Sequence, residues 1–202
     1  RPTFFSSREA VMALAQSRIT VDENAARQMR AQLASHVSFL LHADHISTMT
    51  LLVIAQFIQR MEAAHLPGLG QKRSIALAKR LVAIRVLESE CPGFLREYGY
   101  DLYPNSTRGF FTSLSNLVAR LERYGDNALH LENWRALLDL ERPLRALEKM
   151  LPWVRSLFPQ ESQALKHSAD TLRLIAAGIR EAKVQLGLLS IRRKPIATPR
   201  TA

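Results

Sequence analysis

Apolar residues recur at every third or fourth position through most of this 202-residue chain, and this spacing limits the fold more than any other feature. Its clearest row lies within residues 20–42 and consists of Ala26, Met29, Leu33, Val37 and Leu40 or Leu41. Such a row follows one side of an α-helix but would alternate between the two faces of a strand. Alternating runs bounded by turn residues, which are typical of strands, are not found. The sequence therefore predicts an all-α fold, a bundle of about seven or eight helices, as one body or as two sub-bundles.

Polar residues predict where the first helices begin. Ser6 with Glu9, and Thr20 with Glu23, have the spacing of capping boxes, so we expect helices that end near residues 18 and 42. The helix after them carries MTLLVIAQFI, residues 49–58, which is the most apolar stretch of the chain. This stretch is shorter than the roughly 20 residues that a membrane span needs. We therefore expect a buried central helix, capped by the Ser-Thr pair at residues 47 and 48.

The longest irregular stretch is residues 91–107, CPGFLREYGYDLYPNST. Its content of Gly, Pro, Tyr and Asn predicts a boundary between an N-terminal helical region, residues 1–90, and a C-terminal one, residues 108–190. Residues 191–202 have the composition of a basic disordered tail. The single Cys91 has no disulfide partner in the chain, which favours a reducing, cytoplasmic location.

Glycine and proline predict helix ends in the C-terminal region. Gly125 has the position of a left-handed cap that closes a helix begun near residue 108. Pro143 is expected in the first turn of a later helix, and Pro152 is expected to end it.

The net charge of +10 is concentrated in two segments. Between residues 63 and 87 there are no acids, and the bases are Lys72, Arg73, Lys79, Arg80 and Arg85. The tail adds Arg192, Arg193, Lys194 and Arg200. On the helix after residue 70, apolar side chains are expected to face inward and the bases to share the opposite side. Two local basic surfaces of this kind would suit an anionic partner.

The sequence HLPGLGQKR, residues 65–73, separates the apolar helix from the basic one. Gly68 and Gly70 would leave backbone amides open at a helix start, where the helix dipole favours an anion. The turn resembles the Pro-Gly-Ile-Gly hairpin of the helix-hairpin-helix family, over about residues 58–80. That resemblance implies that the amides of residues 68–70 hold a phosphate, that Lys72 and Arg73 add charge, and that base sequence is not read. A plain turn between two core helices is the alternative interpretation.

These features favour a non-catalytic protein that binds nucleic acid, DNA more than RNA, without sequence specificity. The expected contact residues are Gly68, Leu69, Gly70, Lys72, Arg73, Lys79, Arg80, Arg85, Arg192, Arg193 and Lys194. A helical adaptor or assembly subunit, whose basic face meets an acidic protein or a second copy, is the alternative. No cofactor is expected. No metal is expected either, because His42 and His45 have no third ligand at a recognisable spacing.

Arg60 and His65 give a third hypothesis. Their spacing resembles the Arg-x4-His motif of HEPN ribonucleases, which implies that His65 acts as an acid or base and that Arg60 steadies the phosphate. Met61 departs from that family, in which a polar residue usually follows the arginine.

Overall fold

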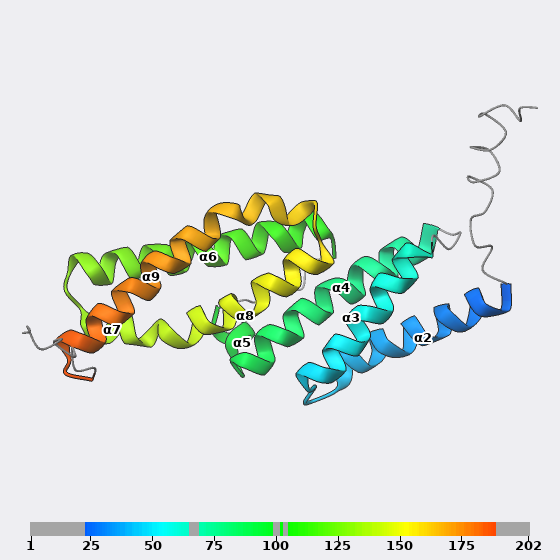
Figure 1. Ribbon diagram of the computed structural model, residues 1–202, viewed down its shortest axis with the longest axis horizontal. Helices are drawn as coiled ribbons and strands as arrows, with labels where there is room; N and C mark the ends of the chain where they lie inside the picture. Colours follow the sequence, from blue (N-terminus) through cyan, green and yellow to red (C-terminus); the bar gives the residue numbers. More distant parts are fainter. Residues whose placement is uncertain (1–22, 65–68, 99–101, 103–104, 189–202) are drawn as a thin grey trace, which may run out of the picture. The chain divides into compact units, whose positions relative to one another are not determined.

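The computed structural model describes residues 23–64, 69–98, 102 and 105–188 (Figure 1). Within these ranges there is no β-strand, and the predicted all-α class is confirmed. The elements in chain order are α2 (Glu23–His42), α3 (Thr48–Ala63), α4 (Leu69–Glu90), α5 (Phe94–Tyr98), α6 (Thr107–His130), α7 (Trp134–Asp139), α8 (Glu141–Leu157), the 3-10 helix η2 (Glu161–Leu165) and α9 (Lys166–Gln185). The helix predicted over residues 6–18 lies outside the described residues.

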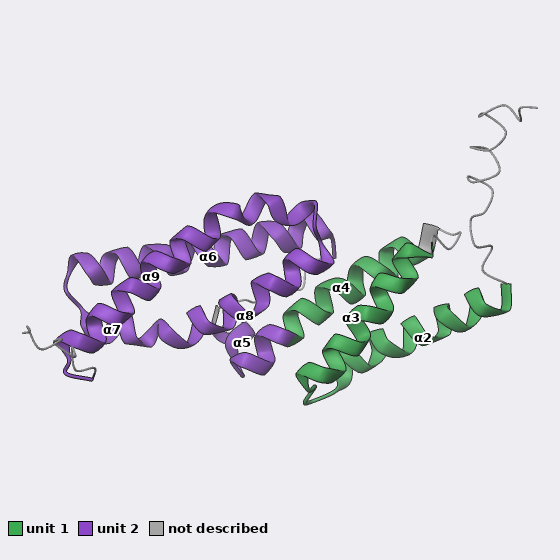
Figure 2. Cartoon of the chain, in the orientation of Figure 1, with its two compact units in different colours: residues 1–85 green, residues 86–202 purple. Residues whose placement is uncertain are grey.

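The chain divides into two compact units, residues 1–85 and residues 86–202 (Figure 2). The division falls inside α4, whereas the sequence placed it in residues 91–107. The described residues of that stretch include α5, and Cys91, Phe94 and Leu95 are buried. The carboxylate of Glu88 accepts hydrogen bonds from the amides of Gly93 and Leu95, at 3.2 and 3.1 Å. These bonds fix the turn between the end of α4 and α5.

Unit 1 contains α2, α3 and the first part of α4. The predicted cap of α3 is Ser47, whose hydroxyl accepts the Thr50 amide at 3.2 Å. α2 buries Ala26, Leu33 and Leu40, as its apolar row predicts. The buried side chains of the other two helices include Leu51, Ile54, Ile58 and Met61 of α3, and Ala78, Leu81, Val82 and Ile84 of α4.

The outer face of α3 is apolar and exposed. Met49, Leu52 and Val53 are 69%, 40% and 54% exposed, so the prediction that residues 49–58 are buried on nearly all sides is wrong for this face. The reason is that unit 1 covers only the side of α3 that carries Leu51 and Ile58. Hydrophobicity alone does not tell a central helix from one with a bare side.

His36 lies against α3 inside unit 1. Its ring meets Phe57 edge-on, with the ring centroids 5.0 Å apart, and its Nε2 is buried without a hydrogen-bond partner. Burial lowers the pKa of His36, because the charged imidazolium would lose its solvation there. His36 is therefore a neutral part of the α2–α3 interface at neutral pH.

Unit 2 is built on close contact between α6 and α9. A Cβ on Gly125 of α6 would lie 3.2 Å from Ile175, and one on Gly178 of α9 would lie 3.1 Å from Leu129. The prediction that Gly125 closes a helix is wrong, because α6 continues through it to His130. Gly125 is buried and gives Ile175 the space to pack against the helix.

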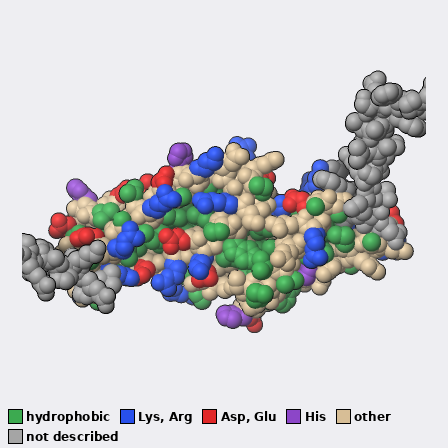
Figure 3. All heavy atoms as spheres, in the orientation of Figure 1, with side chains coloured by type: hydrophobic (Ala, Val, Ile, Leu, Met, Phe, Trp, Pro, Cys, Tyr) green, Lys and Arg blue, Asp and Glu red, His purple; other side chains and the backbone are tan. Residues whose placement is uncertain are grey.

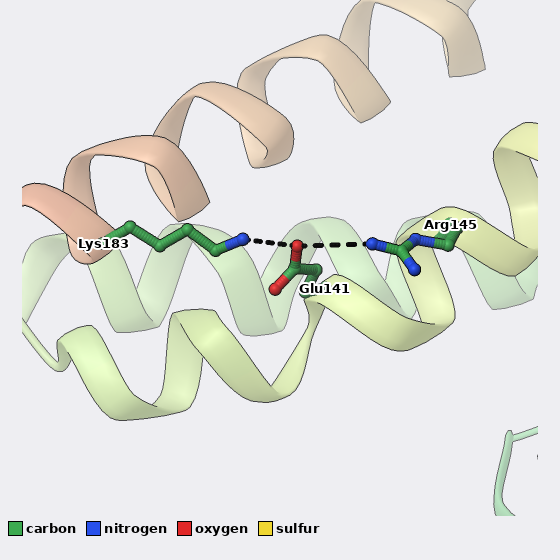
Figure 4. A network of polar contacts seen from close by, with 3 residues as sticks. All are labelled: Glu141, Arg145 and Lys183. Atoms are coloured by element: carbon green, nitrogen blue, oxygen red, sulfur yellow. Dashed lines mark hydrogen bonds and ion pairs between the residues drawn. The ribbon is translucent and has the colours of Figure 1, made fainter. Parts of the chain in front are cut away.

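Pro143 lies in the first turn of α8, as predicted, but Pro152 does not end the helix. Pro152 has no N–H to donate to the carbonyl of Glu148, one turn before it. Both residues are exposed, so water can solvate that carbonyl. At the start of α8, Glu141 accepts a hydrogen bond of 2.6 Å from Lys183 of α9 and forms an ion pair of 3.7 Å with Arg145 (Figure 4). The contact with Lys183 connects α8 to α9.

Candidate functional site

The predicted phosphate hairpin is only partly described. Residues 65–68 lie outside the described residues, as do Arg192, Arg193 and Lys194 of the tail, and the side chains at positions 69 and 70 are not described. α4 begins at Leu69. A phosphate held by residues 68–70 therefore stays a prediction, and so does a ribonuclease role for His65. Arg60 is exposed on the last turn of α3.

The basic residues of α4 do not share one surface. Lys72 and Arg73 are exposed, but Lys79 and Arg80 are only 7% and 6% exposed, so the prediction that the bases lie opposite the apolar side is wrong for these two. Lys79 Nζ lies 2.5 Å from the carboxylate of Glu62 on α3. The sequence carried no sign of this pairing, because the two residues are 17 positions apart on different helices.

Arg85 also turns toward the protein. Its Nε donates a hydrogen bond of 2.6 Å to the carbonyl oxygen of Leu40, and its side chain is half-buried. Leu40 belongs to the last turn of α2, where backbone carbonyls have no partner within the helix. Arg85 therefore supplies a hydrogen-bond donor to a carbonyl at the end of α2. Arg80 is buried, and this burial lowers the pKa of its guanidinium. Arg80 and Arg85 therefore both have a structural role in unit 1.

Unit 1 contains a groove between α2 and α4, with a volume of about 690 Å³. Its apolar lining consists of Leu33, Ala34, Val37, Leu41 and Leu77. Its polar lining consists of Arg30, Ser38, His42, Gln71 and Ser74. These residues recur at intervals of three and four on α2 and at intervals of three on α4, so the walls of the groove are two helical rows. The sequence does not distinguish Leu40 from Leu41 as the last residue of the apolar row. In the structure Leu40 is buried in the core and Leu41 lines the groove.

The groove has basic surroundings. The described residues of unit 1 contain three acids, Glu23, Asp44 and Glu62, and the last of these is paired with Lys79. They contain eight bases, Arg27, Arg30, Arg60, Lys72, Arg73, Lys79, Arg80 and Arg85. Arg27 precedes the lining residue Arg30 by one turn, and Arg73 precedes Leu77 by one turn, so an exposed cation lies one turn from a lining residue on each helix. No acid lines it.

Unit 2 offers weaker candidates. A hollow of about 540 Å³ is lined by residues of α6 and η2, and one of about 370 Å³ by residues of α5, α6 and α7 together with Leu140. Lys, Arg, Asp and Glu are interspersed over the face of unit 2 seen in Figure 3, so that face carries no patch of one charge. The Cys91 thiol is buried, and burial raises its pKa, which is the opposite of what a nucleophile requires.

Two further classes of site were sought in the described part of the chain. It holds no group of three His, Cys, Asp or Glu side chains that could bind a metal ion. None of its helices combines the length and the apolar character needed to cross a membrane. Comparison with protein-family models, with curated proteins and with solved structures gives no match to this chain.

Proposed function

We propose that this protein is a helical adaptor, in which unit 1 binds another protein through the groove between α2 and α4. The observation that carries the proposal is the groove itself, in which Ala34 and Leu41 are exposed and Val37 and Leu77 are half-buried, whereas Leu33 forms its buried floor. Apolar side chains at an open site lose water contact when a partner covers them, and this supplies binding energy. The surrounding arginines favour a partner with acidic side chains beside its apolar ones.

The adaptor proposal predicts peptide ligands that depend on Ala34. A displayed library of random peptides of about 16 residues, long enough to fill the groove as a helix, is selected on the full chain. Ala34→Trp fills the groove, so the selected peptides should lose about tenfold or more in affinity, measured by fluorescence polarisation. Ser35→Trp is the matched control, because Ser35 is an exposed neighbour on α2 that does not line the groove.

Circular dichroism should show equal helicity for the two variants, since both positions are exposed. Peptides that bind the parent and both tryptophan variants equally would place binding outside the groove and remove the proposal. The same holds for a selection that yields no binder.

Nucleic-acid binding is the second candidate. It is favoured by the exposure of Lys72 and Arg73 in the first turn of α4, where the helix dipole adds positive potential. The surface that supports it is smaller than the sequence predicted, because Lys79 and Arg80 are buried and Arg85 is bound to Leu40.

The nucleic-acid candidate predicts a salt-dependent affinity for DNA with little sequence preference. Lys72→Ala with Arg73→Ala should weaken binding and reduce the steepness of log affinity against log salt by about 1.5. Each phosphate contact releases about 0.7 to 0.9 of a counterion on binding, and the variant loses two such contacts. Arg123→Ala with Arg155→Ala removes the same charge from exposed positions of unit 2 and is the control. An unchanged slope in the first variant would exclude these two residues as phosphate contacts.

A further inference from the structure

We infer that the segment bound in the α2–α4 groove is an amphipathic α-helix with acidic residues near the end that meets the start of α4. This inference rests on the proposed function and specifies its partner. It depends on three features of the groove: the nature of its walls, its length, and the position of its cations.

The walls of the groove favour a helix over an extended peptide. Both walls are helices, whose interior backbone amides and carbonyls are already paired along the helix. An extended segment would therefore find no backbone partners there and would leave its own amides and carbonyls unpaired when covered. A helix satisfies its own backbone and needs only apolar side chains on one face. The groove supplies no sheet edge to which a strand could be added.

The lining of α2 extends from Arg30 to His42. At 1.5 Å per residue this distance is about 18 Å, which equals three to four helical turns. The small residues Ala34, Ser38 and Ser74 lie along the walls, and small side chains let a third helix approach closely. The lining of α4 is shorter, from Gln71 to Leu77, so a helix of about 14 residues with one apolar row matches the longer wall of the groove in length.

The cations mark one end of the groove. α2 and α4 run in the same direction in unit 1, and α3 runs against them (Figure 1). Arg27 and Arg30 lie in the first half of α2, and Arg73 is the fifth residue of α4, so all three belong to the same end. The far end carries Leu41 and His42. Acidic residues on the partner helix would therefore be stabilised at the end where α4 begins.

Three synthetic peptides of about 16 residues, one turn longer than the groove, test the helix and the charge separately. The acidic peptide has one leucine row with glutamates at one end. The basic peptide has lysines in place of the glutamates. The broken peptide keeps the leucines and glutamates but has proline in place of a central alanine outside the row, which disrupts the helix. Binding to the full chain is measured by fluorescence polarisation, and bound helicity by circular dichroism.

We expect the acidic peptide to bind about tenfold or more tightly than either of the others, and to lose this affinity in Ala34→Trp but not in Ser35→Trp. Arg27→Glu with Arg73→Glu should make the basic peptide the better ligand. Arg123→Glu with Arg155→Glu makes the same change in net charge on unit 2 and should leave the order unchanged.

Equal binding of the broken peptide would overturn the helical occupant, and equal binding of the basic peptide would overturn the acidic one. Failure of all three peptides would overturn the inference as well. The adaptor proposal would survive any of these results if the random library still yields ligands that depend on Ala34.

Two other occupants would be revealed by the same variants. A dimer of the full chain that Ala34→Trp dissociates, seen by light scattering, would assign the groove to a second copy. Peptide binding that is gained only after residues 1–22 are removed would assign it to the chain's own first segment. Either result would overturn the inference.

Discussion

Phe110→Ala is expected to lower the free energy of unfolding of unit 2 by about 3–5 kcal/mol, because it removes a fully buried aromatic ring from the core. The ring of Phe110 meets Phe111 edge-on, with the centroids 5.5 Å apart, and lies 6.1 Å from Phe158. Phe111 and Phe158 also meet edge-on. The truncation therefore leaves a cavity and breaks two aromatic contacts, in a domain whose total stability is typically about 5–15 kcal/mol.

Urea unfolding followed by tryptophan fluorescence measures this loss directly, because both tryptophans, Trp134 and Trp153, belong to unit 2. Tyr124→Ala is the control, since Tyr124 is on the same helix and is 60% exposed. It should cost less than about 1 kcal/mol. A similar loss in the two variants would mean that the three phenylalanines do not form the core described here.

Glu62→Ala is expected to destabilise unit 1 by about 1–3 kcal/mol, because the Lys79 ammonium would stay buried after losing its carboxylate partner. The Lys79 side chain is 9% exposed and that of Glu62 is 52% exposed. Water can therefore reach the carboxylate, which keeps the cost below that of a fully buried pair. Adding Lys79→Met to Glu62→Ala should restore most of the stability, since the double variant leaves no charge to desolvate.

Unit 1 has no tryptophan, so this loss is best measured by hydrogen exchange of the α3 and α4 amides. Asp44→Ala is the control, because Asp44 is an exposed acid in the same unit. If the double variant is as unstable as Glu62→Ala alone, the unpaired ammonium is not the cause of the loss.

The fold could be predicted where its determinants are local. The Ser47 cap depends on a hydroxyl and an amide three residues apart, and the apolar row of α2 depends on helix geometry alone. Gly125 and Pro152 were interpreted wrongly because their outcome depends on tertiary contacts. Gly125 stays helical because Ile175 needs its space, and Pro152 is tolerated because it faces solvent.

The candidate site was less accessible from sequence for the same reason. Whether a base on α4 faces solvent depends on the groups that the other helices place beside it. Sequence spacing does not pair Lys79 with Glu62, or Arg85 with the carbonyl of Leu40. The groove depends on which side of α2 and α4 is left uncovered, and side-chain identity does not specify that. The phosphate hairpin is predicted from a motif of adjacent residues, 65–73, and does not depend on tertiary contacts. It remains a prediction, because residues 65–68 lie outside the described residues.

The inward orientation of Lys79 and Arg85 has a consequence for how the sequence can change during evolution. The cation at 79 is expected in relatives only where the acid at 62 is present, because the buried ammonium is costly without its carboxylate. Arg85 is expected to be kept as long as α2 ends at the same place, because it binds the Leu40 carbonyl. Lys72 and Arg73 carry no such constraint from the core, so selection on them would come from whatever unit 1 binds.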